Sequence, residues 1–201
     1  MRFGGILKEL LPIIGGLSLM CKQVLTLTHN CDQIVVVTSP EKIQEHARDL
    51  HCFSKVVYAI QTDPRDAWGA ILAGLQFEAD YYHYLYPDVY MDTVHFSYCK
   101  DDFVLHLFDT DKPKQFGCYR DGQIHDKEPA TGTQLAYGAL SWSKEVRDYW
   151  RMQDKNNDIT THTHAFNMAI EQFGCSPQNT IDEYYDISSW EDYKELIKNV
   201  L

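Results

Sequence analysis

The chain has 201 residues, 44% of them hydrophobic, which suffices for one substantial core and is short for two, so we expect a single domain over 1–201. A formal net charge of −11 and a pI near 5.1 exclude an extended nucleic-acid groove, because such a surface needs clustered Lys and Arg. No apolar run approaches the roughly 18 residues that span a bilayer, and the six cysteines form no CxxC pair, so we expect a cytoplasmic protein with buried free thiols and no membrane partner.

Helix and strand signals alternate through the first half of the chain. The predicted helices, where apolar residues recur at helical spacing, cover residues 17–31, 39–50 and 66–79. The predicted strands, where β-branched or aromatic residues run together, cover 33–38, 55–60 and 82–86. This order is typical of an α/β fold with a doubly wound, mixed but mainly parallel sheet, in which ligands bind at the carboxyl ends of the strands. The first helix has no preceding strand, so one βαβ unit lacks its opening strand.

The second half carries more strand signals. Strands are predicted over 103–108, 115–120, 123–127, 134–142 and up to 187, and helices over 144–152, 163–173 and 190–200. Asp121-Gly122 is a two-residue hairpin signal, and Ser188 with Glu191 predicts a capping box for the last helix. His162 and His164 lack further ligands at zinc spacing, so we interpret them as cap or surface residues.

The opening segment holds the most specific pattern in the chain. It contains Arg2, Gly4, Gly5 and Lys8, followed by Leu-Leu-Pro-Ile at 10–13. This resembles the signature of sugar-1-phosphate nucleotidyltransferases, the family of glucose-1-phosphate thymidylyltransferase and its uridylyl and cytidylyl relatives. In that family a glycine-rich turn ends in Arg and is followed by Pro-Lys and Leu-Leu-Pro-Ile. The resemblance implies a Rossmann-like nucleotidyltransferase fold in which the first strand and most of the glycine-rich turn are missing.

The resemblance covers essentially the whole chain and implies a reaction. It predicts that a nucleoside monophosphate passes from a nucleoside triphosphate to a sugar 1-phosphate, giving an NDP-sugar and pyrophosphate. Residues 1–100 would form the nucleotide-binding half and 101–201 the sugar-phosphate-binding half. Arg2 would hold the leaving pyrophosphate and Lys8 the α-phosphate, because an anion attacks a polyanion only where cations screen both. The alternative for Lys8 is a solvated lysine at a helix edge.

The segment Gln61 to Asp66 resembles the family segment whose glutamine reads the edge of a pyrimidine base. Gln61 would contact the base, and Gly4 and Gly5 the nucleotide phosphates. Asp66 stands where the family has a glycine that lets the backbone approach the nucleotide. The alternative for Gln61 is a surface residue at a strand end, so the identity of the base stays open.

Two acids match the family's metal ligands. Asp88 follows the predicted strand 82–86, and Asp186 stands in a Tyr-Asp-Ile segment before the last helix. In the family these carboxylates jointly hold a divalent ion, and one or two carboxylates plus substrate phosphates are the ligands that Mg²⁺ prefers. We therefore expect Mg²⁺ as the cofactor at Asp88 and Asp186, against the alternative of two unrelated turn acids.

Two residues of the second half complete the predicted site. Lys127 lies near the family's Glu-Lys-Pro, whose lysine contacts the sugar phosphate, although Glu128 is inserted before the proline. Gly138 matches a glycine against which the sugar packs, with a simple packing glycine as its alternative.

Other function classes have less support. A catalytically silent nucleotidyltransferase-like module that binds nucleotide or a partner remains the main alternative, since the phosphate-binding turn is incomplete and Leu7 replaces the family's proline. A glycosyltransferase of similar topology would want Asp-x-Asp at the strand end, where this chain has Asp88-Val89-Tyr90. The number of subunits is left open, and a homo-oligomer is compatible with the sequence.

Overall fold

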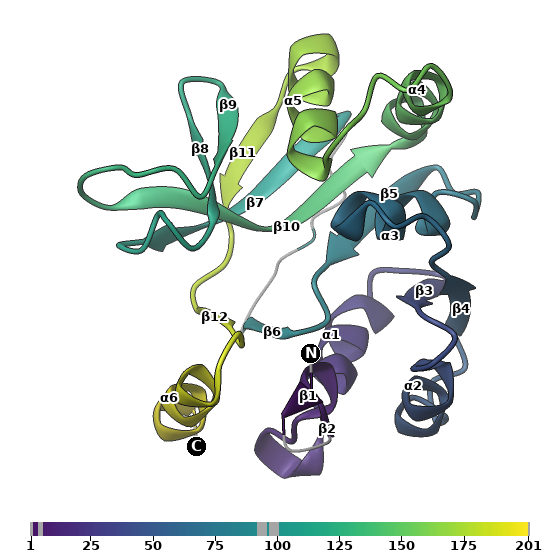
Figure 1. Ribbon diagram of the computed structural model, residues 1–201, viewed down its shortest axis with the longest axis vertical. Coiled ribbons are helices and arrows are strands. Elements are labelled where there is room, and N and C mark those ends of the chain that lie inside the picture. The colour runs from purple at the N-terminus through teal and green to yellow at the C-terminus, as the bar shows by residue number, and fades with distance from the viewer. Residues whose placement is uncertain (1, 4–5, 92–95, 97–100, 201) are drawn as a thin grey trace.

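Strands and helices alternate in the first half of the chain, and strands dominate the second (Figure 1). The computed structural model describes residues 2–3, 6–91, 96 and 101–200. Its helices are α1 (Leu19–Thr28), α2 (Ile43–Asp49), α3 (Asp66–Gly74), α4 (Lys144–Lys155), α5 (His162–Phe173) and α6 (Trp190–Val200), with short 3-10 turns η1 (Lys8–Leu10) and η2 (Ile14–Gly16). Its strands are β1 (Arg2–Phe3), β2 (Ile6–Leu7), β3 (Ile34–Thr38), β4 (Val56–Ile60), β5 (Tyr81–Leu85), β6 (Val89–Met91), β7 (Phe103–Thr110), β8 (Gly117–Arg120), β9 (Gln123–Asp126), β10 (Gln134–Ser143), β11 (Ser176–Asn179) and β12 (Tyr184–Asp186).

The largest sheet is mixed and is organised around the long strand β10. Its order is β11-β7-β10-β8-β9, and β5 pairs with the second half of β10. Strand β10 is antiparallel to β5, β7 and β8, whereas β7 and β11 are parallel. Strands β5, β7, β8 and β11 therefore share one direction, and β9 and β10 oppose it. The predicted α/β fold with a mixed sheet is confirmed.

Two smaller pairs of strands lie beside this sheet. Strands β3 and β4 are parallel, and β6 and β12 are antiparallel. Among the described residues, no ladder joins β3 or β4 to the large sheet. The β6–β12 pair joins the end of the first half of the chain to the end of the second.

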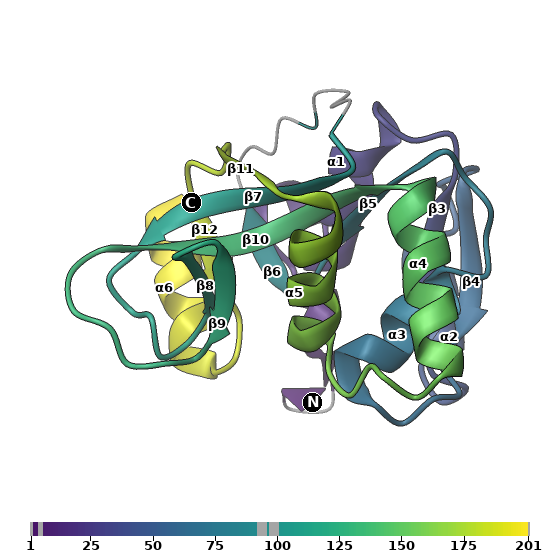
Figure 2. The same ribbon diagram turned by 90° about the horizontal axis from the view of Figure 1, so that it is seen from above.

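The main core is aromatic and lies between the large sheet and the helices. Helices α4 and α5 lie on one face of β7 and β10 (Figure 2). Trp150 of α4 is fully buried, and its ring meets Trp68 and Phe103 edge to face with centroids 5.8 Å apart in each pair. Such contacts add to the stabilisation from burial alone. Each described helix is too short or too polar to cross a bilayer.

Several predicted details are wrong at the level of single residues. The helix predicted over 39–50 begins only at Ile43, because the preceding residues form a turn onto the carbonyl of Ser39. The capping box of α6 uses Ser189 and Asp192: the Asp192 amide donates to Ser189 Oγ at 3.1 Å, and the Ser189 amide donates to Asp192 Oδ2 at 2.6 Å. Cys52 is exposed, so the cysteines are not uniformly buried.

Candidate functional site

Pairing of β6 with β12 brings the two predicted metal ligands together. Asp186 lies opposite Val89 in this ladder, and Asp88 directly precedes Val89. The backbone N–H of Ile187 donates to the carbonyl of Asp88 at 3.3 Å. Asp88, in the turn directly before β6, therefore lies close to Asp186 of β12, although one comes from the middle of the chain and the other from near its C-terminus.

Lys8 completes what we call the cleft cluster, defined as Lys8, Asp88 and Asp186. Its Nζ forms an ion pair with Asp88 Oδ2, and the two side chains are 22% and 19% exposed. Burial alone would lower the pKa of Lys8, but the bond to Asp88 and the charges of Asp88, Asp186 and Glu9 outweigh it, so the pKa lies above its ordinary value. Lys8 is therefore a cation at neutral pH.

The cleft cluster holds more negative charge than Lys8 compensates. Burial and the charge of Asp88 raise the pKa of Asp186, whereas Lys8 and Lys127 act in the opposite direction. A further cation or a cation-bound ligand would relieve this imbalance. The two carboxylates supply the hard oxygen donors that suit a Mg²⁺ ion whose remaining ligands are phosphate and water. Within the described residues no three acidic, His or Cys side chains group as a metal site, so such an ion would depend on substrate oxygens.

A second cluster, missed in the sequence, lies on the other side of η1. Glu9 is 4% exposed, and its Oε1 accepts from Lys42 Nζ at 3.0 Å and from His46 Nε2 at 3.2 Å. Burial alone would raise the pKa of Glu9, but the bonds from His46 and Lys42 lower it to about 2. We call Glu9, Lys42 and His46 the buried cluster. A charged residue between Leu7 and the apolar pair Leu10-Leu11 was the available sequence signal.

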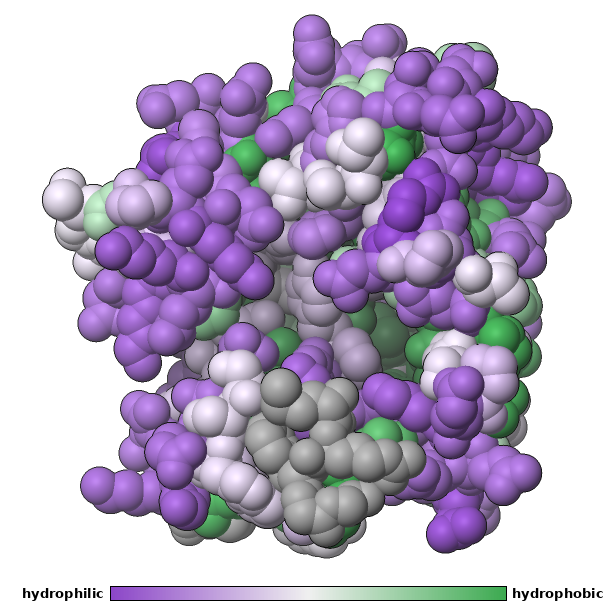
Figure 3. Space-filling view, viewed as in Figure 1, coloured by the Kyte–Doolittle hydropathy of each residue, from purple (hydrophilic) through white to green (hydrophobic). Residues whose placement is uncertain are grey.

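A large cavity opens in the molecule, and none of the three cleft-cluster residues lines it. It measures about 770 Å³ and lies between the loop before α3, strand β9 and the start of α5. Figure 3 shows this face of the molecule hollowed between the positions of the β8–β9 hairpin and α3 in Figure 1. Lys127, at the end of β9, links the two features, because its charge acts on Asp186 and also on His162 of the cavity wall.

His162 lines this cavity, which the sequence interpretation as a cap or surface residue did not anticipate. Thr161 is the N-cap of α5, and its Oγ1 accepts from the His164 amide at 3.1 Å. Burial lowers the pKa of His162, with Lys127 acting in the same direction and Asp126 and Asp66 opposing. The imidazole is therefore neutral at pH 7. The signal in the sequence was the Thr-rich run at the start of a predicted helix.

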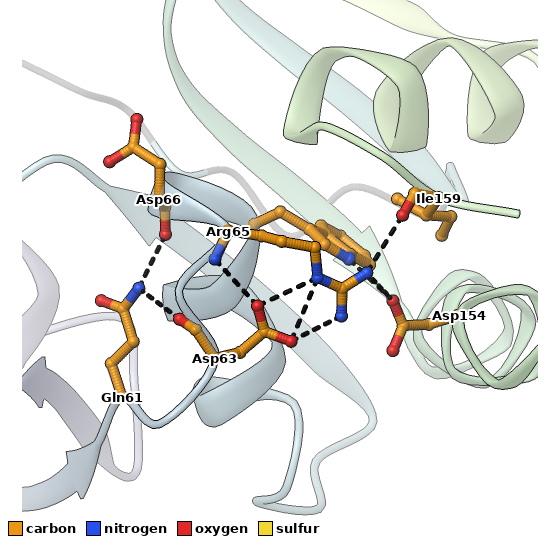
Figure 4. A network of polar contacts seen from close by, with 7 residues as sticks. Gln61, Asp63, Arg65, Asp66, Asp154 and Ile159 are labelled. Atoms are coloured by element: carbon orange, nitrogen blue, oxygen red, sulfur yellow. Dashed lines mark hydrogen bonds and ion pairs between the residues drawn. The ribbon is translucent and has the colours of Figure 1, made fainter. Parts of the chain in front are cut away.

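Gln61 is held inside the loop between β4 and α3 (Figure 4). Its Nε2 donates to the carbonyls of Asp63 at 3.0 Å and Asp66 at 2.9 Å, and its backbone N–H donates to Thr38 at 2.8 Å. Asp66 has a φ of 45°, in the left-handed region that favours glycine. The position at which the resemblance implies a glycine therefore has the backbone conformation of one.

The remaining predicted site residues are placed as follows. Gly138 lies at an irregularity of the β7–β10 ladder, and a Cβ there would meet the Tyr184 ring at 2.7 Å and Ile181 at 2.8 Å, which gives this glycine a packing role. Arg2 pairs with Leu7 across the β1–β2 hairpin. Gly4 and Gly5 lie outside the described residues.

Solved structures of nucleotidyltransferases share this arrangement of strands and helices. The chain is similar to a protein from Bacillus anthracis assigned as a glucose-1-phosphate thymidylyltransferase and solved with a sucrose, at 15% identity and a TM-score of 0.81 over 96% of this chain and 85% of that one. It is also similar to the inositol-1-phosphate CTP transferase of T. maritima (16% identity, TM-score 0.70, 98% and 88% of the chains) and to a UTP-bound UGPase of Acinetobacter baumannii (13%, 0.73, 96% and 85%). At these identities the likeness establishes the fold. No family model and no curated protein matches the sequence.

Proposed function

We propose that this protein transfers a nucleoside monophosphate from a nucleoside triphosphate to a sugar 1-phosphate and releases pyrophosphate. The observation that carries the proposal is the cleft cluster, in which Lys8 meets Asp88 and Asp186, and Asp186 also lines a cavity of about 180 Å³. The chain is similar in fold to solved nucleotidyltransferases, and this similarity supports the same class of reaction by analogy.

In this reaction a phosphate oxygen of the acceptor attacks the α-phosphorus, and the bond to pyrophosphate breaks. Lys8 would neutralise charge at the α-phosphate, and Lys127 would hold the phosphate of the acceptor. Arg2, Gly4 and Gly5 would bind the triphosphate and Gln61 the base, and Gly138 would support the sugar-phosphate side of the site by letting Tyr184 and Ile181 pack against β10. Because the nucleophile is already an anion, positioning and charge screening supply the rate.

A divalent cation fits beside these residues. Asp88 and Asp186 would hold it, in keeping with the burial and the charge of Asp88 that together raise the pKa of Asp186. Bound Mg²⁺ would supply further screening of the phosphate charges. This chain's own part is to present the two carboxylates close together, one in β12 and one in the turn before β6, and to keep Lys8 next to them.

The test is a pyrophosphate-release assay with Mg²⁺, each common nucleoside triphosphate and a panel of sugar 1-phosphates. We expect release that depends on the acceptor and that falls roughly 100- to 1,000-fold in Lys8→Met, as for loss of one charge-stabilising group. Lys155→Met is the matched control, because Lys155 is exposed at the end of α4. Nucleotide binding without release by the folded protein would contradict transfer and identify a silent nucleotide-binding module instead.

A further inference from the structure

Gln23 is a polar residue on the buried face of α1. The neighbouring buried positions of this helix are mostly apolar, among them Leu19, Met20 and Val24. Gln23 is 4% exposed, and its Nε2 donates to the carbonyl of Val89 in β6 at 2.7 Å. Because a buried amide costs free energy unless its polar atoms are paired, the partners of this side chain decide whether the fold tolerates it.

The bond from Gln23 takes the place of a strand partner at the edge of β6 that faces away from β12. In the β6–β12 ladder the Ile187 N–H donates to the Asp88 carbonyl, and in an antiparallel ladder the polar groups of successive residues point to alternate sides. The polar groups of Val89, which lies directly opposite Asp186, therefore point away from β12. Gln23 reaches the Val89 carbonyl from that side and fastens α1 to the residue that follows Asp88.

Helix α1 is tied at its start to the turn that carries Lys8. The Leu19 N–H donates to the Leu11 carbonyl at 3.1 Å, and the Leu11 N–H donates to the Lys8 carbonyl at 3.2 Å. The ion pair between Lys8 Nζ and Asp88 Oδ2 closes a ring of contacts that runs through η1, α1 and β6. The bond from Gln23 to β6 therefore helps to set where Asp88 lies relative to Lys8.

Only part of the Gln23 amide is paired. Its Oε1 is buried and has no hydrogen-bond partner among the residues that the structure describes. An unpaired buried acceptor is destabilising, and an apolar side chain of the same shape would avoid that cost. The unpaired oxygen thus offsets what the bond to Val89 contributes to stability. The glutamine is better explained by where it holds β6 than by a gain in stability.

We propose that Gln23 is a positioning residue of the cleft cluster, which holds β6 so that Asp88 stays beside Lys8 and Asp186. Gln23 acts through the Val89 carbonyl rather than on a substrate. The consequence for catalysis rests on the proposed function, in which the two carboxylates take up a divalent cation together.

A double-mutant cycle in the metal-free protein tests the positioning. Gln23→Met keeps the length and the helix propensity of the side chain but removes the donor. We expect Gln23→Met to change the unfolding equilibrium constant in urea by a factor roughly two or more smaller in a Lys8→Met background than in the unaltered protein, as for residues of one network. Gln23→Leu is a second apolar variant with the same expectation. Equal responses in both backgrounds overturn the proposal, because a merely structural residue would not be coupled to Lys8.

Cation binding is the second measurement. The probe is Mn²⁺ with pyrophosphate, which supplies phosphate oxygens, and calorimetry gives the dissociation constant of the ion. We expect Mn²⁺ to bind folded Gln23→Met roughly tenfold more weakly than the unaltered protein, the lower end of the effect of losing a group that orients a metal ligand. Gln134→Met is the matched control, because Gln134 Nε2 donates to the Thr131 carbonyl at 3.0 Å at the start of β10. It should leave the affinity unaltered.

The two measurements separate this inference from the proposed function. If Mn²⁺ binds neither the unaltered protein nor Gln23→Met but Gln23 and Lys8 are coupled in unfolding, the proposed cation site is wrong and the positioning role stands. If Mn²⁺ binds Gln23→Met as tightly as the unaltered protein, the positioning role is overturned and the proposed cation site stands.

Discussion

Two charge clusters flank one short turn of the chain and have opposite electrostatic character. Lys8 and Glu9 are neighbours in η1, yet Lys8 pairs with Asp88 in the cleft, whereas Glu9 is buried against α2. In the buried cluster the pKa of the carboxyl falls to about 2. In the cleft cluster the pKa of Asp186 rises.

The difference distinguishes a carboxylate that stabilises the fold, Glu9, from a carboxylate whose ionised form a bound cation would stabilise, Asp186. Glu9 is satisfied by two donors and gains stability from its charge. Asp186 is buried and lies near the charge of Asp88, and Lys8 offsets these effects only in part, so the ionised form of Asp186 is disfavoured in the free protein. Perturbed carboxyls of the second kind are typical of functional sites, where charge is arranged for a ligand rather than for the free protein.

The largest effect on stability is expected from Glu9→Gln. The change replaces the buried carboxylate with a neutral amide and removes the charge that attracts Lys42 and His46, which should cost about 3 kcal/mol of unfolding free energy at pH 7. Since the folded pKa of Glu9 is lowered to about 2 from an ordinary 4.5, its stabilisation is complete above pH 4.5 and is lost as the pH falls toward 2. Urea unfolding at several pH values measures this trend.

Glu171→Gln provides the control, since Glu171 is exposed on α5 and loses the same charge. It should change the unfolding free energy little at any pH. If Glu9→Gln lowers the unfolding free energy as much at pH 2 as at pH 7, then side-chain size and packing, not charge, hold η1 against α2.

Gly138→Ala should have the next largest effect, because Gly138 supports the strand that carries Asp186. A new Cβ would lie within 2.7–2.8 Å of the Tyr184 ring and of Ile181, so strand β12 must shift. Overpacking of this kind costs about 1–3 kcal/mol, measured by thermal unfolding. Gly74→Ala is the control, because its Cβ meets only Val37 at an ordinary 3.8 Å and alanine favours the helix. An unchanged melting temperature for Gly138→Ala would mean that β12 moves freely, and Asp186 with it.

The sequence predicted elements well where one periodicity dominated. The β-branched run at 33–38 and the Asp121-Gly122 turn could be predicted from local sequence alone. They are present in the structure as β3 and the β8–β9 hairpin. Strand β6 was missed because its three residues follow a Pro-Asp turn and pair with β12, which lies far along the chain near the C-terminus. Pairings of that range are set by tertiary structure.

Residue types identified the cleft cluster, but they did not reveal the hydrogen-bond partners of Glu9 and Gln61. Lys8, Asp88 and Asp186 stood out because their chemistry and resemblance to a family coincide, and the structure brings them together. The partners of Glu9 come from α2, and Gln61 is bound by carbonyls of its own loop. Backbone carbonyls and buried ion pairs leave no pattern in a single sequence, so neither constraint was foreseeable.

The sharpest comparison of the two clusters comes from Asp186→Asn, although its effect on stability is the smallest of the three. The folded pKa of Asp186 is raised, so the penalty for its charge exists above that pKa and vanishes once the group is protonated in both the folded and the unfolded state. Asp186→Asn should therefore raise the melting temperature at pH 7 and lose this advantage as the pH is lowered toward 4, while nucleotidyl transfer falls. Loss of one negative charge would then stabilise the cleft cluster and destabilise the buried cluster at the same pH. A lower melting temperature for Asp186→Asn at pH 7 would mean that the charge of Asp186 is already compensated in the free protein. Binding a cation at the cleft cluster would then bring no electrostatic stabilisation.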